Sequence, residues 1–428
     1  EKTEGIPFFI EEFTRSLKDL NIVENRDGGC YLKKGVQDIT VPATIQDLIM
    51  ARIDSLPEGA KEVLQTGSAI EREFSYALIG RVMGIPEQEL LTHLSVLKDS
   101  ELLYERGIHP QSTYIFKHAL TQEVAYDSLV KRRRRDIHAR IARGMEELYA
   151  DRIEEHFEML SHHFEQSGHA AKAVDYLILA GEKSNKHNAV QAASAFFQKA
   201  LELSENEGIE LAAETKVRVH RGRARASFNI GDIDTAVYGY RKVIEISRKQ
   251  GMLDQERKGL LGLTSMMYMW PVRAEAEQTL EEAMSWAKEK GDKAFESITL
   301  SYMGHSTIVD GEPQKAIQMT LDAQRIAMAT GNTEAIFTTH MMRSFSERLL
   351  GNPKKTIELT QGMFDSLRKS YALNPLMYLI LLRGIALAET GRTEDSIAIL
   401  RSGMDISEKF GAFFRLASFH NSLGYCYG

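Results

Sequence analysis

Residues Tyr114 to Leu129 read YIFKHALTQEVAYDSL, and at this stretch the character of the chain changes. Residues 114–116 are a β-branched and aromatic run typical of a strand, and apolar residues then recur at helical spacing from Leu120. Upstream, short strand-like and helical pieces alternate, whereas downstream every segment has the pattern of an amphipathic helix. His118 falls where the helix would begin, so its ring and the N–H groups of the first turn could face an anion together. The stretch therefore predicts a joint between a mixed module and an all-helical one.

The module before this joint has the order of elements of a winged helix. Its apolar spacing predicts three helices followed by a β-hairpin, over residues 63–70, 74–84, from Pro86 onward, and over 101–106 and 112–117. The third helix would be the DNA-reading helix of such a module. Its polar side consists of Glu87, Gln88, Glu89, Thr92, His93, Ser95, Lys98 and Asp99. This face is not basic, and the chain carries a net charge of −7, so we expect no nucleic-acid partner.

The first 56 residues precede this module. Pro7 near a helix start, followed by the apolar residues Phe9, Phe13 and Leu17, predicts a buried helix. Residues 23–35 contain Asp-Gly-Gly between two apolar runs and predict a hairpin. A further helix is predicted from Ile45 up to Pro57.

A basic run, Lys131 to Arg135, begins the first helix after the joint. Such a run could bind nucleic acid or an anionic membrane. It lies inside a helix that continues through Met145, and acidic residues follow it at Glu146, Glu147, Asp151, Glu154 and Glu155. We therefore expect a solvated face or an internal ion-pair network.

The remaining sequence repeats with a period of 40 residues. Turn glycines recur at Gly231, Gly311, Gly351 and Gly391, and helix ends at Gly251, Gly291 and Gly331. Two columns of small residues keep the same register, one at Ala224, Thr264, Gly304, Ser344, Gly384 and Gly424, the other at Ala236, Ala276, Ala316, Thr356 and Ser396. Small side chains at fixed places on both helices of a hairpin allow close packing, and such periods are typical of solenoids. The pattern resembles tetratricopeptide repeats in a longer variant, and it predicts an α-α superhelix.

Composition limits the cellular setting. The two cysteines, Cys30 and Cys426, are too few and too far apart for a disulfide framework or a metal site, which indicates a reducing cytosol. No apolar run is long enough for a membrane helix and no signal peptide is visible, so we expect a cytoplasmic protein without a membrane partner. The chain opens on Glu1 rather than Met and ends inside a new repeat at Gly428. We expect residues to be missing at both ends.

Together these motifs resemble the STAND class of signal-transduction ATPases, in particular bacterial members linked to adenylate cyclase or kinase domains. The resemblance covers essentially the whole chain and lies in the order of the motifs: GIP at 5–7 followed by FFIEE, a winged helix, FKHAL at 116–120 with EVAY at 123–126, and the repeats. In that class the Gly-x-Pro loop lies against the adenine, and the histidine contacts the β-phosphate of ADP in a closed, inactive form. The resemblance therefore implies nucleotide contacts for Pro7 and His118. The class usually has Met-His-Asp at the joint, but this chain has Lys117-His118-Ala119, which leaves the aspartate's role unsupported. The plainer alternative is a helix-starting proline and a histidine that caps its own helix.

The sequence motifs of the P-loop ATPase domain are absent from this chain. There is no Gly-x-x-x-x-Gly-Lys-Ser/Thr loop and no strand ending in paired acids. We expect no catalytic residues, no hydrolysis and no cofactor in this chain, with ATP or ADP and Mg bound only by the full-length protein. His156, His162 and His163 lie on one acidic helix without an evident fourth ligand, so no metal site is predicted.

We therefore predict a mainly α chain of three parts. Residues 1–56 would be the end of the nucleotide-binding and lid region, 57–130 the winged helix, and 131–428 the tetratricopeptide-like array. The array would sense a protein or peptide effector, and the winged helix would couple it to a P-loop ATPase domain of the same polypeptide, which controls an output such as a cyclase. The predicted partner-binding residues, on the first helices of the hairpins, are Arg223, Trp270, Tyr302 and Arg343. Two alternatives remain: a stand-alone repeat scaffold, and a fragment of a transcription regulator of the maltose-activator type.

Overall fold

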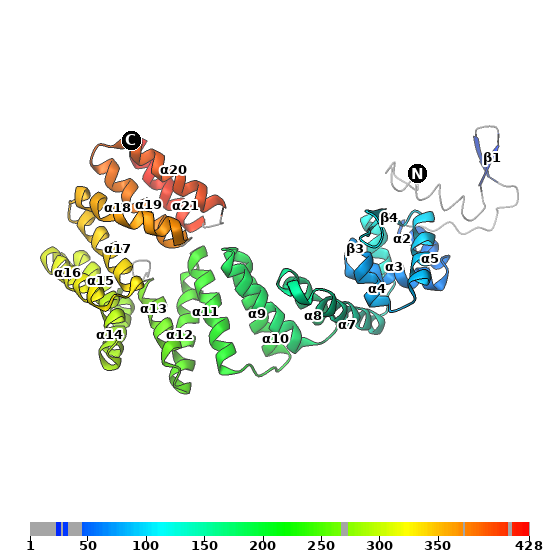
Figure 1. The fold of residues 1–428 in the computed structure, drawn as a ribbon, viewed down its shortest axis with the longest axis horizontal. Coiled ribbons are helices and arrows are strands. Elements are labelled where there is room, and N and C mark those ends of the chain that lie inside the picture. Colours follow the sequence, from blue (N-terminus) through cyan, green and yellow to red (C-terminus); the bar gives the residue numbers. More distant parts are fainter. Residues whose placement is uncertain are drawn as a thin grey trace. The chain divides into compact units, whose positions relative to one another are not determined.

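The computed structural model describes residues 23–26, 29–32, 45–266, 273–370, 373–409 and 413–427. It divides the chain into two compact units, residues 1–176 and 177–428. The chain is mainly α-helical, as predicted, and strands occur among the described residues only in the first unit (Figure 1).

The first unit begins with the predicted hairpin. Strands β1 (Val23–Arg26) and β2 (Gly29–Leu32) pair antiparallel, and α2 (Ile45–Asp54) follows. The predicted helix around Pro7 lies outside the described residues. The three helices and the hairpin predicted for the next module are present with one additional strand, β3, and the order is α3 (Glu58–Ile70), β3 (Glu73–Ser75), α4 (Tyr76–Met83), α5 (Glu87–Asp99), β4 (Leu103–Arg106) and β5 (Thr113–Phe116).

Strand β3 was not predicted, because Phe74 had been assigned to the second helix of the module. Its backbone is extended and pairs with β5, so that the antiparallel sheet has the order β3-β5-β4. The Phe74 ring is buried and stacks on Tyr114 across the two strands, with centroids 6.0 Å apart. Ser75 then caps α4 by accepting a hydrogen bond from the N–H of Leu78 at 3.2 Å. The contact that makes Phe74 a strand residue is thus with a residue 40 positions away.

Beyond the sheet, α6 (Ala119–Asp127), α7 (Lys131–Leu148), the 3-10 segment η1 (Ala150–His156) and α8 (Phe157–Gln166) complete the first unit. Helix α7 packs on α3 and α4. Arg140 donates from Nε to the carbonyl of Val82 at 3.0 Å, and Gly144 leaves only 3.3 Å between a would-be Cβ and the side chain of Val82. These contacts hold α7 in the first compact unit, which ends at Tyr176.

The division between the units falls within α9 (Ala170–Lys186), and the second unit continues as helical hairpins (Figure 1). After α10 (Val190–Asn206), the first helices of the hairpins are α11 (Ala213–Ile230), α13 (Leu253–Thr264), α15 (Lys293–Val309), α17 (Thr333–Leu349), α19 (Leu373–Glu389) and α21 (Phe413–Tyr427). The second helices are α12 (Ile233–Gln250), α14 (Arg273–Lys290), α16 (Pro313–Thr330), α18 (Pro353–Ser370) and α20 (Thr393–Lys409).

The repeated glycines end the helices, as predicted. All seven adopt positive φ, from 65° at Gly331 to 87° at Gly231, a conformation that glycine reaches without strain. The residue after the glycine donates its N–H back to the last helical turn, as Asp232 does to Ser227 and Arg392 to Leu387, each at 2.9 Å. In this Schellman pattern the carbonyl groups of the last helical turn accept hydrogen bonds that the helix itself cannot provide.

The two columns of small residues face each other within the hairpins. The buried hydroxyl of Thr356 donates to the carbonyl of Ser344 at 3.0 Å, and that of Ser396 to the carbonyl of Gly384 at 2.7 Å. A Cβ on Gly304 would lie 3.2 Å from the carbonyl oxygen of Ala316. The columns therefore allow the two helices to pack backbone against side chain, as predicted.

First and second helices differ in how much surface they expose. Every residue from 335 to 348 of α17 is buried or half-buried, whereas α16 exposes positions such as Gln318, Arg325 and Met328. The core is continuous across neighbouring hairpins, and Phe295 and Trp286 meet edge to face in it at 5.9 Å. Among the described residues, no helix combines the length and the apolar character needed to span a bilayer.

Candidate functional site

His118 stands at the predicted joint. It is the N-cap residue of α6, directly after β5, and it is half-buried. Its side chain makes no capping hydrogen bond to its own helix. The neighbouring Lys117 forms an ion pair with Glu101 at 2.7 Å, so its charge is already matched within the sheet. Pro7, the other predicted nucleotide contact, lies outside the described residues.

The predicted partner-binding residues of the array have different environments. Trp270 lies outside the described residues. Tyr302 is only 6% exposed and belongs to the apolar core, so the surface position predicted for it is wrong. It lies on α15, which is covered by neighbouring helices on most of its circumference.

Arg223 and Arg343 are half-buried and reach a neighbouring second helix. Arg223 donates from Nη2 to Oε1 of Gln198 at 3.2 Å, and Arg343 from Nη1 to Oε1 of Gln324 at 2.6 Å. Arg383, which the sequence reading did not select, occupies the same place in the 40-residue register and donates to the carbonyl of Ile357 at 2.7 Å. The acceptors are neutral amide or carbonyl groups, although Glu347 also lies 3.6 Å from Nε of Arg343. These three arginines are called the arginine row below.

The basic run at the start of α7 forms ion pairs, but with other partners than expected. Arg133 pairs with Glu62 of α3 at 2.8 Å, and Arg134 lies 3.4 Å from Asp127. The expected partner Glu146 instead pairs with Lys172 at 2.8 Å. At a rise of about 1.5 Å per residue, thirteen positions put Arg133 and Glu146 roughly 20 Å apart along the same helix. Residues on other elements are therefore closer.

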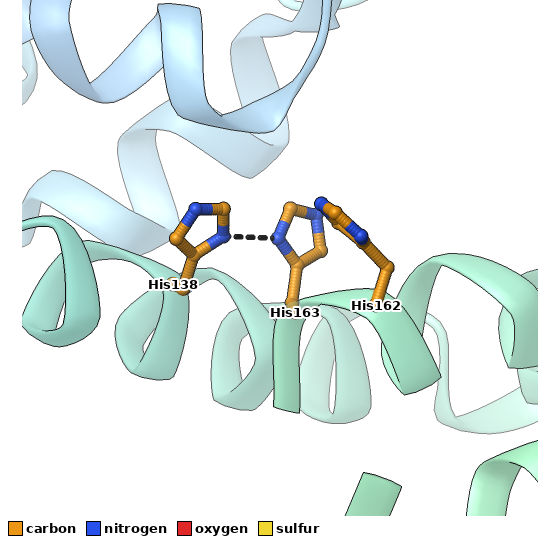
Figure 2. Close-up of side chains that lie close together, drawn as sticks. All are labelled: His138, His162 and His163. Carbon is orange, nitrogen blue, oxygen red and sulfur yellow. Dashed lines mark hydrogen bonds between the residues drawn. The ribbon is translucent and has the colours of Figure 1, made fainter. Parts of the chain in front are cut away.

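Three histidine side chains of the first unit lie close together (Figure 2). His138 comes from α7, and His162 and His163 come from α8. One ring nitrogen from each of the three lies within 4.8 Å of the others. Nδ1 of His138 and Nδ1 of His163 face each other at 2.8 Å, and the Tyr126 hydroxyl lies 2.9 Å from Nε2 of His138. This histidine cluster thus has a hydrogen-bonded inner pair and a third, exposed ring.

Burial decides the charge of the inner pair. His138 and His163 are each 1% exposed. Burial, together with the neighbouring histidines, lowers the pKa of His163 to about 3, and burial with His162 and Arg134 lowers the pKa of His138 to about 4. Both rings are therefore neutral at physiological pH. A neutral imidazole has one nitrogen lone pair available as an acceptor or a metal ligand.

His138 is not among the histidines grouped from the sequence, which are His156, His162 and His163. His156 instead stacks on Tyr149, with centroids 4.0 Å apart. His138 lies next to Ile137 and one turn from Ile141 and Ala142, on the buried face of α7. A histidine within the apolar stripe of an amphipathic helix is the signal that could have identified it, because such a ring must find a buried partner.

No family model matches the chain. An uncharacterized protein of Rhizobium meliloti (strain 1021) is 22% identical over 258 residues, which are 59% of this chain and 24% of that protein. The chain thus matches about a quarter of the length of this curated relative.

Several solved structures are similar at low sequence identity. A STAND protein with a tetratricopeptide repeat sensor from Pyrococcus horikoshii has a TM-score of 0.37 at 14% identity, over 91% of this chain and 65% of that one. The apo quorum sensor NprR from B. thuringiensis has a TM-score of 0.41 at 11% identity, over 90% and 100%. Aspartyl phosphate phosphatase F from Bacillus subtilis has a TM-score of 0.45 at 12% identity, over 86% and 96%. Similarities of this size identify neither a function nor a partner.

Proposed function

We propose that this chain is the regulatory and sensor portion of a multidomain signalling ATPase of the STAND type. In this proposal the repeat array binds a protein or peptide effector, and the winged-helix module couples that event to the nucleotide state of a P-loop domain in the same polypeptide. The chain itself does not hydrolyse nucleotide. The output under control is a domain such as an adenylate cyclase.

The observation that carries the proposal is the position of His118. The residue is the N-cap of α6, two positions after the end of β5, and it is half-buried. The first turn of α6 contains no acidic residue that would occupy its N–H groups. A helix N-terminus favours an anion, and an imidazole N–H adds a donor beside it. This combination supports a contact with a phosphate of ADP.

The arginine row supports an acidic segment as the effector. Arg223, Arg343 and Arg383 recur at one register position of the first helices, and their hydrogen bonds go largely to neutral groups. A guanidinium matches a carboxylate in charge and in hydrogen-bond geometry. The row therefore favours a protein or peptide with acidic side chains.

The test uses the full-length protein that contains the P-loop domain. His118→Ala should weaken ADP binding and raise basal output, because a hydrogen bond to a charged group contributes about 1.5–3 kcal/mol, or roughly 10- to 150-fold in affinity. His109→Ala is the matched control, since His109 lies in the β4–β5 turn and contacts Tyr76 and Glu87 instead. Equal ADP affinity and equal basal output in both variants would refute the role of His118.

A further inference from the structure

The histidine cluster plays no part in the proposed signalling function, and its geometry is that of a ligand set. Three imidazoles from two helices converge, and each offers one nitrogen within 4.8 Å of the other two. In a tetrahedral zinc site the Zn–N distance of about 2.0–2.1 Å places two ligand nitrogens about 3.3 Å apart. The Nδ1 atoms of His138 and His163, at 2.8 Å, need only small ring rotations to open to that distance.

The hydrogen bond between the two inner Nδ1 atoms places a proton on one of them, so metal binding requires that this proton move to Nε2 of its own ring. Metal ions bind neutral imidazole, and both of these rings are buried. For both Nδ1 lone pairs to face one ion, His163 must carry its proton on Nε2, and so must His138 on its own Nε2. The Tyr126 hydroxyl oxygen lies 2.9 Å from that nitrogen and can accept the hydrogen bond. Such an outer partner fixes the tautomer and the orientation of a metal-ligating histidine.

The exposed ring of His162 lies where an ion could enter the cluster from solvent. His162 is exposed, whereas His138 and His163 are buried, so an ion can reach the cluster from the solvent side without opening the core. That side also leaves room for a water molecule as the fourth ligand. Glu158 and Glu165, four residues before and three after His162, lie on the same side of α8 and bring negative charge to the mouth of the site.

The positive charge of Arg134 opposes the binding of a cation at the histidine cluster. Its guanidinium lies over the Tyr126 ring, 4.1 Å from the centroid, and its charge disfavours a cation near His138. Arg134 is held in place by the carbonyl of Tyr126 at 3.0 Å and by Asp127 at 3.4 Å. Affinity must therefore come from the three imidazole ligands themselves.

We propose that His138, His162 and His163 bind one divalent transition-metal ion, with Tyr126 as the outer hydrogen-bond partner of His138. Three imidazoles suit Zn²⁺ among the metals available to a cell. The ion connects α7 to α8 and thereby fixes the helix pair that lies between the sheet module and the repeats along the chain.

The experiment uses the tag-free chain after treatment with a chelator. Co²⁺ is titrated as a spectroscopic probe and is then displaced by Zn²⁺, and the melting temperature is recorded with and without Zn²⁺. One equivalent of Co²⁺ should give the visible absorption of a tetrahedral site, and Zn²⁺ should raise the melting temperature. His162→Ala should weaken binding by at least about 100-fold and abolish the stabilisation, since even outer-shell changes cost about 10- to 100-fold. Its exposed position makes this variant compatible with folding, which circular dichroism checks.

His169→Ala is the matched control, because His169 is an exposed histidine in the turn between α8 and α9 whose ring contacts Ser167. This variant should bind Co²⁺ and Zn²⁺ like the wild type. Tyr126→Phe should bind roughly tenfold more weakly while it keeps the tetrahedral spectrum. A wild-type protein that binds no Co²⁺ at one equivalent, or a His162→Ala variant with wild-type affinity, would overturn the proposal.

Discussion

Substitution of Gly222 by alanine tests how tightly the hairpins pack. The buried ring of Phe197 in α10 lies between Gly222 of α11 and Gly181 of α9. A Cβ on Gly222 would lie 2.4 Å from Cζ and 2.6 Å from Cε2 of that ring, and a Cβ on Gly181 would lie 2.9 Å from Cζ. Because glycine flanks the ring on both sides, Phe197 cannot move away from an added methyl group without displacing a helix.

The magnitude follows from two opposing terms. Alanine in place of glycine in a helix interior gains about 1 kcal/mol of helix propensity. An extra methyl group in a filled core costs about 1–3 kcal/mol. Gly362 of α18 provides the matched control, since nothing lies within 4 Å of its would-be Cβ. Gly362→Ala should therefore gain the propensity alone, and Gly222→Ala should be less stable than Gly362→Ala by the full packing term.

The assay is thermal unfolding of both variants, followed by circular dichroism. A repeat array does not unfold as one two-state unit, so the comparison rests on the difference between the two melting temperatures. For a domain of this size, about 1 kcal/mol corresponds to about 2–4 °C. We expect Gly362→Ala to melt above the wild type and Gly222→Ala to melt at or below it. Equal stabilisation by both substitutions would refute the wedged position of Phe197, and so would a failure of Phe197→Leu to relieve Gly222→Ala.

Two further predictions concern the repeats. Burial lowers the pKa of His305 to about 4 in the folded protein. Between about pH 6.5 and 4 this histidine is therefore protonated more in the unfolded chain than in the folded one, and the free energy of unfolding decreases as the pH decreases. The free energy of unfolding should decrease by at most about 2 kcal/mol from pH 7 to pH 5 because of this group. In His305→Phe this contribution is lost, so the urea midpoint should shift less between the two pH values than in the wild type. An unchanged shift would contradict the assignment. If the arginine row binds the effector, Arg343→Ala and Arg383→Ala should each weaken capture of the same protein from the source cell's lysate about tenfold, measured by quantitative mass spectrometry. Arg325→Ala, at an exposed position of α16 paired with Asp322, should leave that capture unchanged, and equal loss in all three variants would contradict the prediction.

Part of the candidate site was predictable from sequence. His118 was expected at the start of the helix after the sheet and partly exposed, and it lies there. That expectation needed only the local change from strand to helix pattern. The arginine row was found in part, since Arg223 and Arg343 were selected from the first helices. Arg383 was missed although it stands 40 residues after Arg343, because the register had been applied to the small residues and not to the arginines.

Other assignments depended on contacts that the sequence does not display. Tyr302 was expected at the surface and is in the core, because which side of a first helix is covered depends on the neighbouring hairpins. Phe74 became a strand residue by pairing with β5. Arg133 paired with Glu62 of another helix and not with an acid further along its own.

The sequence by itself determined the repeat, its period and the ends of its helices. Those features are local: a helix ends where a glycine can adopt positive φ, and a hairpin closes where both helices carry small residues. Only the tertiary structure decided that His138 meets His162 and His163. These residues are separated by 24 and 25 positions, and their approach depends on the rotation of α7 and α8 about their axes, which packing against α3, α4 and each other sets. Local backbone conformation can be predicted from the sequence, whereas the side of a helix that becomes an interface depends on the neighbouring elements that pack against it.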